Sequence, residues 1–120
     1  MCRSTNSRGG LPNRTGVALC DDKGKTWRYG EDNPILPLNK PYDKEATGSV
    51  WVIRENDTYR MYYTAIGRYY PKPQGAKTGH GNTIPEIGIG YAISRDGIHW
   101  TKPFDHTVVS PRGFATDPYE

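Results

Sequence analysis

The sequence contains no long hydrophobic run. Only 34% of the 120 residues are hydrophobic, and no stretch approaches the roughly 18 consecutive apolar residues that a membrane-spanning helix requires. Residues 1–10 also lack the apolar segment of a secretory signal peptide. We therefore expect no membrane partner, and the sequence leaves both a cytoplasmic and a secreted location open.

Clusters of charge of one sign and metal-ligand patterns are also missing. The net charge of +3 comes from Lys and Arg residues that are scattered along the chain, without a basic helix or patch. Such a distribution gives no sign of nucleic-acid binding. The 3 histidines and 2 cysteines do not have the spacing of a metal cage with carboxylates. We expect no nucleic-acid partner, no metal and no cofactor.

Cysteine is scarce, and two residues cannot form a disulfide framework. Cys2 and Cys20 could pair once in an oxidising compartment. Cys20, however, lies in a predicted strand with one face toward the core. The favoured interpretation is a buried free thiol at Cys20 and a disordered Cys2.

Turn-forming and aromatic residues, by contrast, are abundant, with 14 Gly, 10 Pro, 9 Tyr and 3 Trp. This composition favours a soluble, β-rich fold. One pattern occurs twice, at residues 16–27 and 88–100, where small and apolar residues lead through Asp and Gly to a Trp. Aligning Trp27 with Trp100 gives an offset of 73 (100 − 27), which also aligns Gly24 with Gly97. A repeat of this length is nearer to a four-stranded propeller blade with a long loop than to a helical repeat.

Each copy of the repeat predicts a strand, a tight turn and a returning strand. Asp22 and Asp96 are predicted to accept hydrogen bonds from backbone amides of the turn, while the glycine of each copy tolerates a positive φ. The tryptophan of each copy has enough apolar area to lie between neighbouring sheets. We therefore interpret both aspartates as turn residues and not as catalysts.

The predicted fold is all-β, with two loops and six strands. Residues 1–15 are predicted to be loop, and residues 65–86 a long functional loop or a disordered one. Strands are predicted at residues 16–20, 26–29, 48–53, 59–64, 87–94 and 100–110. In an up-down-up-down sheet, residues 42–49, 65–86 and 113–118 would lie at one rim, and Asp22 and Asp96 at the other.

The two copies of the repeat resemble motifs of two protein families. Residues 20–27 (Cys-Asp-Asp-Lys-Gly-Lys-Thr-Trp) are similar to the Asp box of sialidases, Ser-x-Asp-x-Gly-x-Thr-Trp, with Cys20 in the Ser position. Residues 89–100 resemble the blade motif of the five-bladed propeller glycosidases, which include invertases, levanases, fructosyltransferases and arabinanases. The resemblance implies β-propeller blades of four antiparallel strands. Residues 16–40 would end one blade, residues 42–110 would form a complete blade, and residues 113–120 would begin a third.

The same resemblance implies a catalytic residue. Residues 46–50 align with residues 115–119 at an offset of 69 (117 − 48), which places Asp117 where the earlier copy has Gly48. Residues 47–50 look like the Ser-Gly-Ser motif of invertase-like families, and Thr116-Asp117-Pro118 looks like their Arg-Asp-Pro motif, with Thr116 in place of Arg. The implied role of Asp117 is to stabilise the oxocarbenium-like transition state. The alternative is that Asp117-Pro118 forms an ordinary turn.

Further residues of this rim are predicted to bind sugar. Aromatic rings can stack on sugar rings, and polar groups can bind hydroxyls. The alternatives are a solvated charge cluster around Asp43 and aromatic side chains that anchor the loop on its own blade. The predicted substrate-binding residues are Ser49, Asp43, Tyr69, Tyr70 and His80. His99 and His106 are interpreted as bystanders.

The sequence thus predicts a piece of a propeller enzyme that hydrolyses or transfers glycosidic bonds in fructans, arabinans or related oligosaccharides. Its partners would be the oligosaccharide and the rest of the propeller. Whether the chain itself is an enzyme stays open, because it would hold one of three catalytic carboxylates and glycoside hydrolysis needs a pair. The alternatives are a non-catalytic glycan-binding propeller and a sialidase-like propeller.

Overall fold

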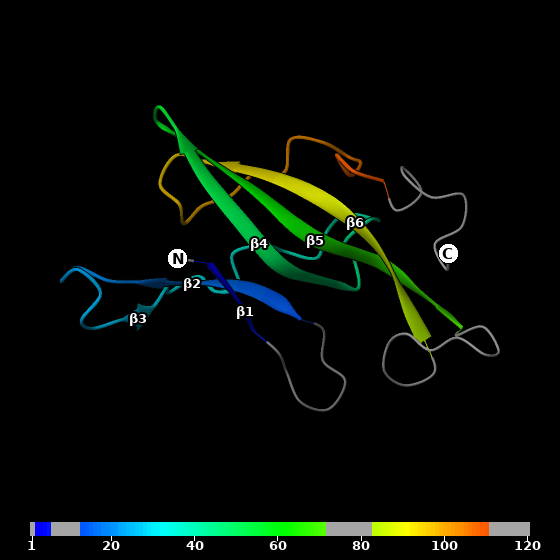
Figure 1. The fold of residues 1–120 in the computed structure, drawn as a ribbon, viewed down its shortest axis with the longest axis horizontal. Coiled ribbons are helices and arrows are strands. Elements are labelled where there is room, and N and C mark those ends of the chain that lie inside the picture. The colour runs from blue at the N-terminus through cyan, green and yellow to red at the C-terminus, as the bar shows by residue number, and fades with distance from the viewer. Residues whose placement is uncertain (1, 6–12, 72–82, 111–120) are drawn as a thin grey trace.

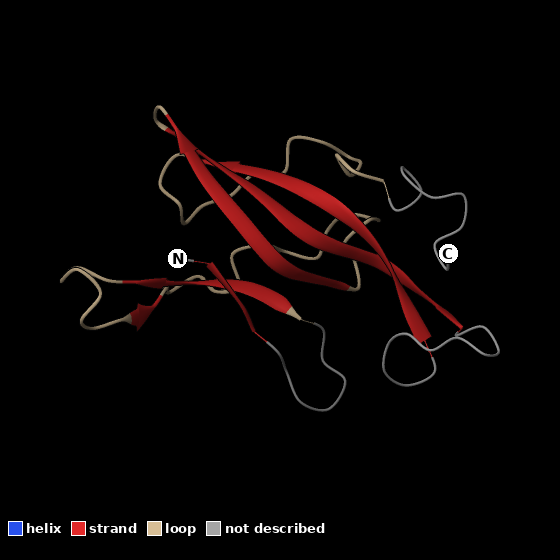
Figure 2. Cartoon of the chain, viewed as in Figure 1, coloured by secondary structure: helices blue, strands red, loops and turns tan. Residues whose placement is uncertain are grey.

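The computed structural model describes residues 2–5, 13–71 and 83–110. These residues form two three-stranded antiparallel sheets, ordered β1-β2-β3 and β4-β5-β6 (Figure 1). The described ranges contain no helix (Figure 2), and so none that could cross a membrane. The strands are β1 (Cys2–Thr5), β2 (Arg14–Leu19), β3 (Arg28–Tyr29), β4 (Ala46–Glu55), β5 (Thr58–Pro71) and β6 (Thr83–Ser94). The prediction of an all-β fold is confirmed.

The larger sheet follows from a regular alternation of buried and exposed residues along β5. Met61, Tyr63 and Ala65 are buried, whereas Tyr62 between them is exposed. This period of two is the signature of a strand with one face on a core. β4 and β5 meet in a hairpin at Asn56, whose φ of 55° is one that Asn adopts more readily than most residues. The predicted strands 48–53, 59–64 and 87–94 lie within β4, β5 and β6.

The predicted loop at residues 65–86 is wrong at both of its ends. β5 continues to Pro71, and β6 begins at Thr83, so that the two strands pair in register as far as Pro71 and Thr83. The glycines and prolines of this stretch suggested a loop. Gly67 instead marks a β-bulge between the pairs of Ile66 and Arg68, and the ladder resumes after it. Residues 72–82 of the predicted loop lie outside the described residues.

The predicted fourth strand at residues 100–110 is reduced to two isolated bridges. Ile93 pairs with Thr101, and Ile89 pairs with Val109. Three residues of β6 lie between these bridges, whereas seven residues lie between their partners. Residues 102–107 therefore loop away from the strand before Val108 N donates to Ile89 O at 2.8 Å. Pro103 lies in this loop and has no N–H to donate to a ladder.

The smaller sheet begins earlier than predicted, because β1 and the start of β2 lie in the stretch expected to be loop. Cys2 pairs with Val17 in the β1-β2 ladder, so the expectation of a disordered Cys2 is wrong. β3 is only two residues long. Beyond β3, the Asn33 side chain bonds both the N–H and the C=O of Val17, at 2.8 Å each, and so satisfies that edge of β2.

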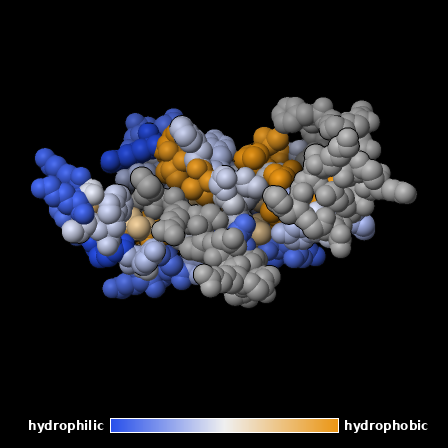
Figure 3. Space-filling view, turned by 60° about the horizontal axis from the view of Figure 1, so that its bottom comes forward, coloured by the Kyte–Doolittle hydropathy of each residue, from blue (hydrophilic) through white to orange (hydrophobic). Residues whose placement is uncertain are grey.

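One hydrophobic core lies between the two sheets. Val17, Ile35 and Leu36 come from the smaller sheet and the segment that follows it. The larger sheet contributes Met61, Tyr63, Ala65 and Ala92. Trp100 packs against this core, but Trp27 is 51% exposed, so its predicted place between sheets is wrong in this chain. Hydrophobic residues gather toward the middle of the molecule, and the end with the first Asp turn is hydrophilic (Figure 3).

Candidate functional site

The two ends of the larger sheet carry different groups of residues. At one end Ala46 pairs with Ile66, close to the segment that leads into β4. At the other end Tyr59 pairs with Ser94, next to the turn that contains Asp96. For the described residues, this arrangement confirms the predicted separation of the two rims.

Asp22 lies at the same rim as Asp96. The start of β2 is fixed near the start of β4, because Thr15 Oγ1 and Thr47 Oγ1 are 3.1 Å apart and buried. β2 then runs toward the other rim. There, His99 Nε2 lies 3.7 Å from Asp32 Oδ2, and Asp32 is in the segment that follows β3.

The two Asp turns share a hydrogen-bond pattern. In the first, Asp22 Oδ1 accepts from Cys20 Sγ at 3.0 Å and from Thr26 N at 2.9 Å. In the second, Asp96 Oδ1 accepts from Ser94 Oγ at 3.0 Å and from His99 N at 2.8 Å. Hydrogen bonds hold the pKa of both carboxyl groups far below the usual range. The largest cause is the side-chain bond from Thr26 Oγ1 for Asp22 and that from His99 Nδ1 for Asp96, each at 2.6 Å, and the backbone bonds add to it. The prediction that both aspartates hold turns is confirmed.

The geometry corrects the register of the repeat by one residue. Gly24 N donates to Cys20 Sγ at 2.7 Å, and Gly97 N donates to Ser94 Oγ at 2.9 Å, so Cys20 and Ser94 are equivalent. Their offset is 74 (94 − 20), although the glycines are offset by 73 (97 − 24). The first copy therefore holds one additional residue, Lys23, at a φ of 60°. Cys20 acts as a polar turn residue with a free, half-buried thiol, and not as a fully buried one.

The opposite rim holds an open groove of about 370 Å³. Three stretches line it: the segment before β4, the part of the β5-β6 ladder around the bulge at Gly67, and the loop between the bridges of Thr101 and Val109. Its polar groups include two ion pairs at its margin, Arg68 with Glu86 at 2.6 Å and Lys40 with Asp105 at 2.5 Å. The lining residues are Pro41, Tyr42, Lys44, Gly67, Arg68, Glu86, Gly88, Asp105, His106 and Thr107.

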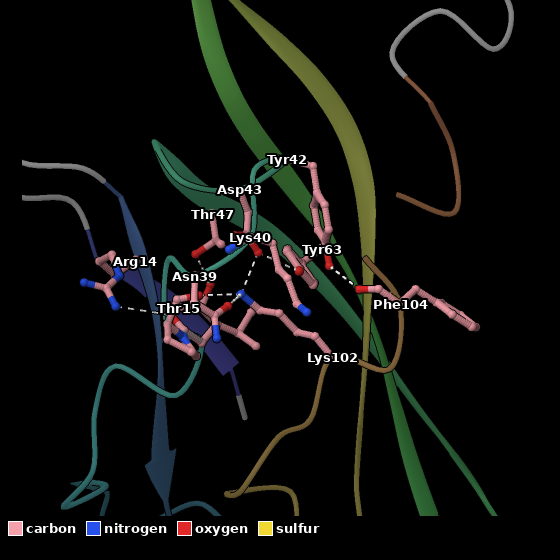
Figure 4. A network of polar contacts seen from close by, with 12 residues as sticks. Arg14, Thr15, Asn39, Lys40, Tyr42, Asp43, Thr47, Tyr63, Lys102 and Phe104 are labelled. Carbon is pink, nitrogen blue, oxygen red and sulfur yellow. Dashed lines mark hydrogen bonds and ion pairs between the residues drawn. The ribbon is translucent and has the colours of Figure 1, made fainter. Parts of the chain in front are cut away.

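A buried polar network joins the segment before β4 to β5 and to the loop after β6 (Figure 4). Asp43 is fully buried, and its Oδ2 accepts from Tyr63 OH at 2.9 Å and from Lys102 Nζ at 2.6 Å. Its Oδ1 accepts from Lys40 N at 3.0 Å. Lys102 Nζ also donates to Asn39 Oδ1 at 2.9 Å and to the carbonyl of Pro37.

Burial shifts the pKa of the partners of Asp43. Burial is the largest cause that raises the pKa of Tyr63 far above its usual range, and the neighbouring Asp43 carboxylate adds to it. Burial also lowers the pKa of Lys102, against the opposing effect of its hydrogen bond to Asp43. Tyr63 is thus held as a neutral donor, and Asp43 is far from the solvated cluster considered from the sequence. Direct sugar binding by Asp43 stays a prediction, and it would require these contacts to open.

The other predicted site residues are dispersed. Ser49 is exposed at the bulge between Thr47 and Val50 in β4. Tyr69 is exposed on the β5-β6 arm, and Tyr70 lies under the Arg68 guanidinium, 4.3 Å from its ring centre. Tyr69 and Tyr70 are therefore strand residues near the groove and not members of a free loop. Asp117 and His80 lie outside the described residues.

Lys102 and the stacked rings near it were not predicted from the sequence. Tyr91 stacks on Phe104 with ring centres 5.8 Å apart, and Phe104 stacks on His106 at 5.3 Å. The only sequence signal was a Lys before Pro103 in an expected edge strand, which does not indicate burial. In the residues that the structure describes, no group of three His, Cys, Asp or Glu is placed to hold a metal ion.

Two curated proteins of Mycobacterium tuberculosis are similar to this chain: the uncharacterized proteins MT1551 of strain CDC 1551 and Rv1502 of strain H37Rv. Each is 34% identical over 92 residues, which cover 75% of this chain and 26% of the relative. The match thus spans about a quarter of the relatives' length. No family model and no solved structure matches the chain.

Proposed function

We propose that this chain is part of a β-propeller of four-stranded blades that binds a carbohydrate at the rim opposite the Asp turns. In the longer protein, this rim would serve hydrolysis or transfer of a glycosidic bond. The observation that carries the proposal is the groove, on which three separate stretches converge at this rim. Ionic and aromatic groups around an open concave surface suit the hydroxyls and ring faces of a sugar.

The groove offers defined roles for its side chains. Arg68 and Glu86 can exchange part of their mutual ion pair for hydrogen bonds to sugar hydroxyls, since the Arg68 side chain is 56% exposed. Tyr42 lines the groove, and its OH donates to Phe104 O at 3.1 Å. Ala115 aligns with Ala46 at the start of β4, and Asp117, two residues later, is the proposed transition-state stabiliser.

Binding is tested first on the chain itself. Titration calorimetry with fructo- and arabino-oligosaccharides should show binding, and Arg68→Ala should weaken it roughly tenfold, in line with the loss of one charge-assisted hydrogen bond. Lys25→Ala, at the Asp-turn rim, is the matched control and should leave affinity unchanged. Equal affinity of Arg68→Ala and the unaltered chain would remove the groove from the proposal.

Catalysis is tested in a longer protein that contains this chain. Its Asp117→Asn form should turn over an aryl fructoside or arabinofuranoside about 100-fold more slowly, with kcat and kcat/KM falling together, because the lost charge acts in the transition state. Sugar binding by a longer protein that shows no turnover would support the non-catalytic alternative instead.

A further inference from the structure

The acidic side chains that line the groove are each paired with a basic side chain. Glu86 Oε2 accepts from Arg68 Nε at 2.6 Å, and the Glu86 side chain is only 23% exposed. Asp105 Oδ1 accepts from Lys40 Nζ at 2.5 Å. This hydrogen bond is the largest cause that lowers the pKa of Asp105 and raises the pKa of Lys40, so both groups remain charged near neutral pH. Both carboxylates of the lining are therefore neutralised by cations of the same chain.

Lys44, by contrast, lines the groove without such a partner. It is exposed, and in the part of the chain that the structure describes no side chain forms an ion pair or hydrogen bond with its ammonium group. The preceding Asp43 is buried and already binds Lys102. The following residue, Glu45, does not line the groove. The groove thus presents one positive charge that the described residues do not compensate.

His106 adds a hydrogen-bond acceptor to the same lining. Its Nδ1 lies 2.9 Å from the carbonyl oxygen of Thr107, and because a carbonyl only accepts, Nδ1 carries the proton. The Nε2 atom of the neutral ring is then an acceptor, which suits a sugar hydroxyl and not an anion. The His106 ring stacks on Phe104 with ring centres 5.3 Å apart, which limits its rotation. The groove therefore combines a site for a hydroxyl with a separate cation.

The charge balance around the groove favours a ligand with a single negative charge. Lys40, Lys44 and Arg68 stand against Glu86 and Asp105, which gives a balance of +1 (3 − 2). A phosphate dianion would gain from the same Lys44, but it would also be repelled twice as strongly by the two carboxylates. A carboxylate carries one charge and matches the balance. Uronic acids are sugars that carry such a group next to their hydroxyls.

We propose that the groove binds an acidic carbohydrate, with the carboxylate of a uronic acid on the Lys44 ammonium group and sugar hydroxyls on His106 and the Arg68-Glu86 pair. This inference rests on the proposed function and specifies its substrate class. Lys44 is then the residue that determines specificity, because a neutral sugar of the same shape can make the hydroxyl contacts but not the charge contact.

The test is titration calorimetry of the chain with two matched ligands. One is a trisaccharide of galacturonic acid, and the other is the neutral trisaccharide obtained by reducing its carboxyl groups to alcohols. The acidic ligand should bind roughly fivefold more tightly, in the upper range for an exposed charge pair. Raising the salt from about 20 mM to about 500 mM should remove most of this preference, because salt screens exposed charges.

Three variants assign the preference to one side chain. Lys44→Gln should bring the ratio of the two affinities close to one, and Lys44→Arg should keep the preference for the acidic ligand. Lys25→Gln removes a charge at the opposite rim and is the matched control, which should behave like the unaltered chain. Circular dichroism shows that each variant is folded.

The outcomes separate this inference from the function on which it rests. Equal binding of the two ligands by the unaltered chain would overturn the inference and leave carbohydrate binding in place. A preference that survives Lys44→Gln would overturn the assignment to Lys44. Tighter binding of a matching sugar phosphate would overturn the choice of a carboxylate. If neither ligand and no neutral fructo- or arabino-oligosaccharide binds, the proposed function itself fails, and this inference fails with it.

Discussion

Lys102 Nζ lies 2.6 Å from Asp43 Oδ2, although 59 residues separate the two in the sequence. The Lys102 side chain is 5% exposed and that of Asp43 is not exposed at all. The pair joins the segment before β4 to the loop after β6, and both segments line the candidate groove. A buried charge pair of this kind fixes the relative position of two segments that have no regular ladder between them.

We expect Lys102→Met to lower the free energy of unfolding by about 3 kcal/mol, because it leaves the Asp43 carboxylate buried without its cation. Methionine keeps much of the volume of the lysine stem, so the loss reports on the charge and not on a cavity. The measurement is urea unfolding followed by circular dichroism. Lys25→Met, at an exposed position, is the control and should change the stability little. An equally small change for Lys102→Met would show that Tyr63 and the Lys40 amide suffice to hold Asp43.

The sequence allowed the strands and the Asp turns to be predicted because their determinants are local. Alternating apolar residues and an Asp-Gly turn need only near neighbours, so β4, β5, β6 and both turns were found. The Asp43-Lys102 pair depends on two segments that meet only after the sheets pack. The sequence around Asp43 therefore suggested sugar binding or a solvated charge cluster, whereas the folded chain buries this residue.

The ends of the predicted loop failed for a related reason. The glycines and prolines of this stretch signal turns, yet cross-strand pairing with β6 continues past Gly67 as far as Pro71. A bulge at Gly67 absorbs the irregularity. Local turn signals were overridden by pairing with a partner strand that the sequence does not reveal locally.

The equivalence of the two Asp turns predicts equal behaviour of two variants. Asp22→Ala and Asp96→Ala should each lower the melting temperature by several degrees, because each removes an acceptor of hydrogen bonds from turn donors. Turnover per folded molecule of the longer protein should stay unchanged, since both turns lie at the rim opposite the groove. Loss of turnover at an unchanged melting temperature would place the affected aspartate in the active site. Thermal scans and initial rates on the same samples make the comparison.

The contact between His99 and Asp96 predicts a pH dependence. His99 Nδ1 lies 2.6 Å from Asp96 Oδ2, and this hydrogen bond is the main cause that raises the pKa of His99 above its ordinary 6.5. The contribution of charged His99 to stability is fully present below pH 6.5 and is lost as the pH rises through the raised pKa of His99. The lowered pKa of Asp96 acts in the opposite direction: its contribution is present above its ordinary 3.8 and is lost as the pH falls through the lowered value.

The stability advantage of the unaltered chain over His99→Gln should therefore be largest between pH 3.8 and pH 6.5. Above the raised pKa of His99 the advantage should shrink. Denaturant unfolding of both proteins across this range measures it, and an NMR titration of the His99 ring locates the pKa directly. His106→Gln is the matched control, because His106 Nδ1 contacts a backbone carbonyl and not a carboxylate. An advantage that does not vary with pH would mean that His99 contributes only as a neutral ring.

Gly67 links the strand irregularity to the shape of the groove. A Cβ at this position would lie 2.6 Å from the carbonyl oxygen of Pro41 and 3.0 Å from the Cα of Tyr42, both backbone atoms that cannot rotate away. Gly67→Ala should therefore destabilise the chain by about 1–3 kcal/mol and push residues 41–42 out of the groove. Gly48→Ala is the matched control, because its Cβ would meet only the Thr64 side chain at an ordinary 3.5 Å. Urea unfolding gives the stability, and backbone NMR shifts at Tyr42 and Lys44 show whether the groove has moved. Unchanged shifts together with the expected loss of stability would mean that β5 yields at the bulge and that the segment before β4 keeps its place.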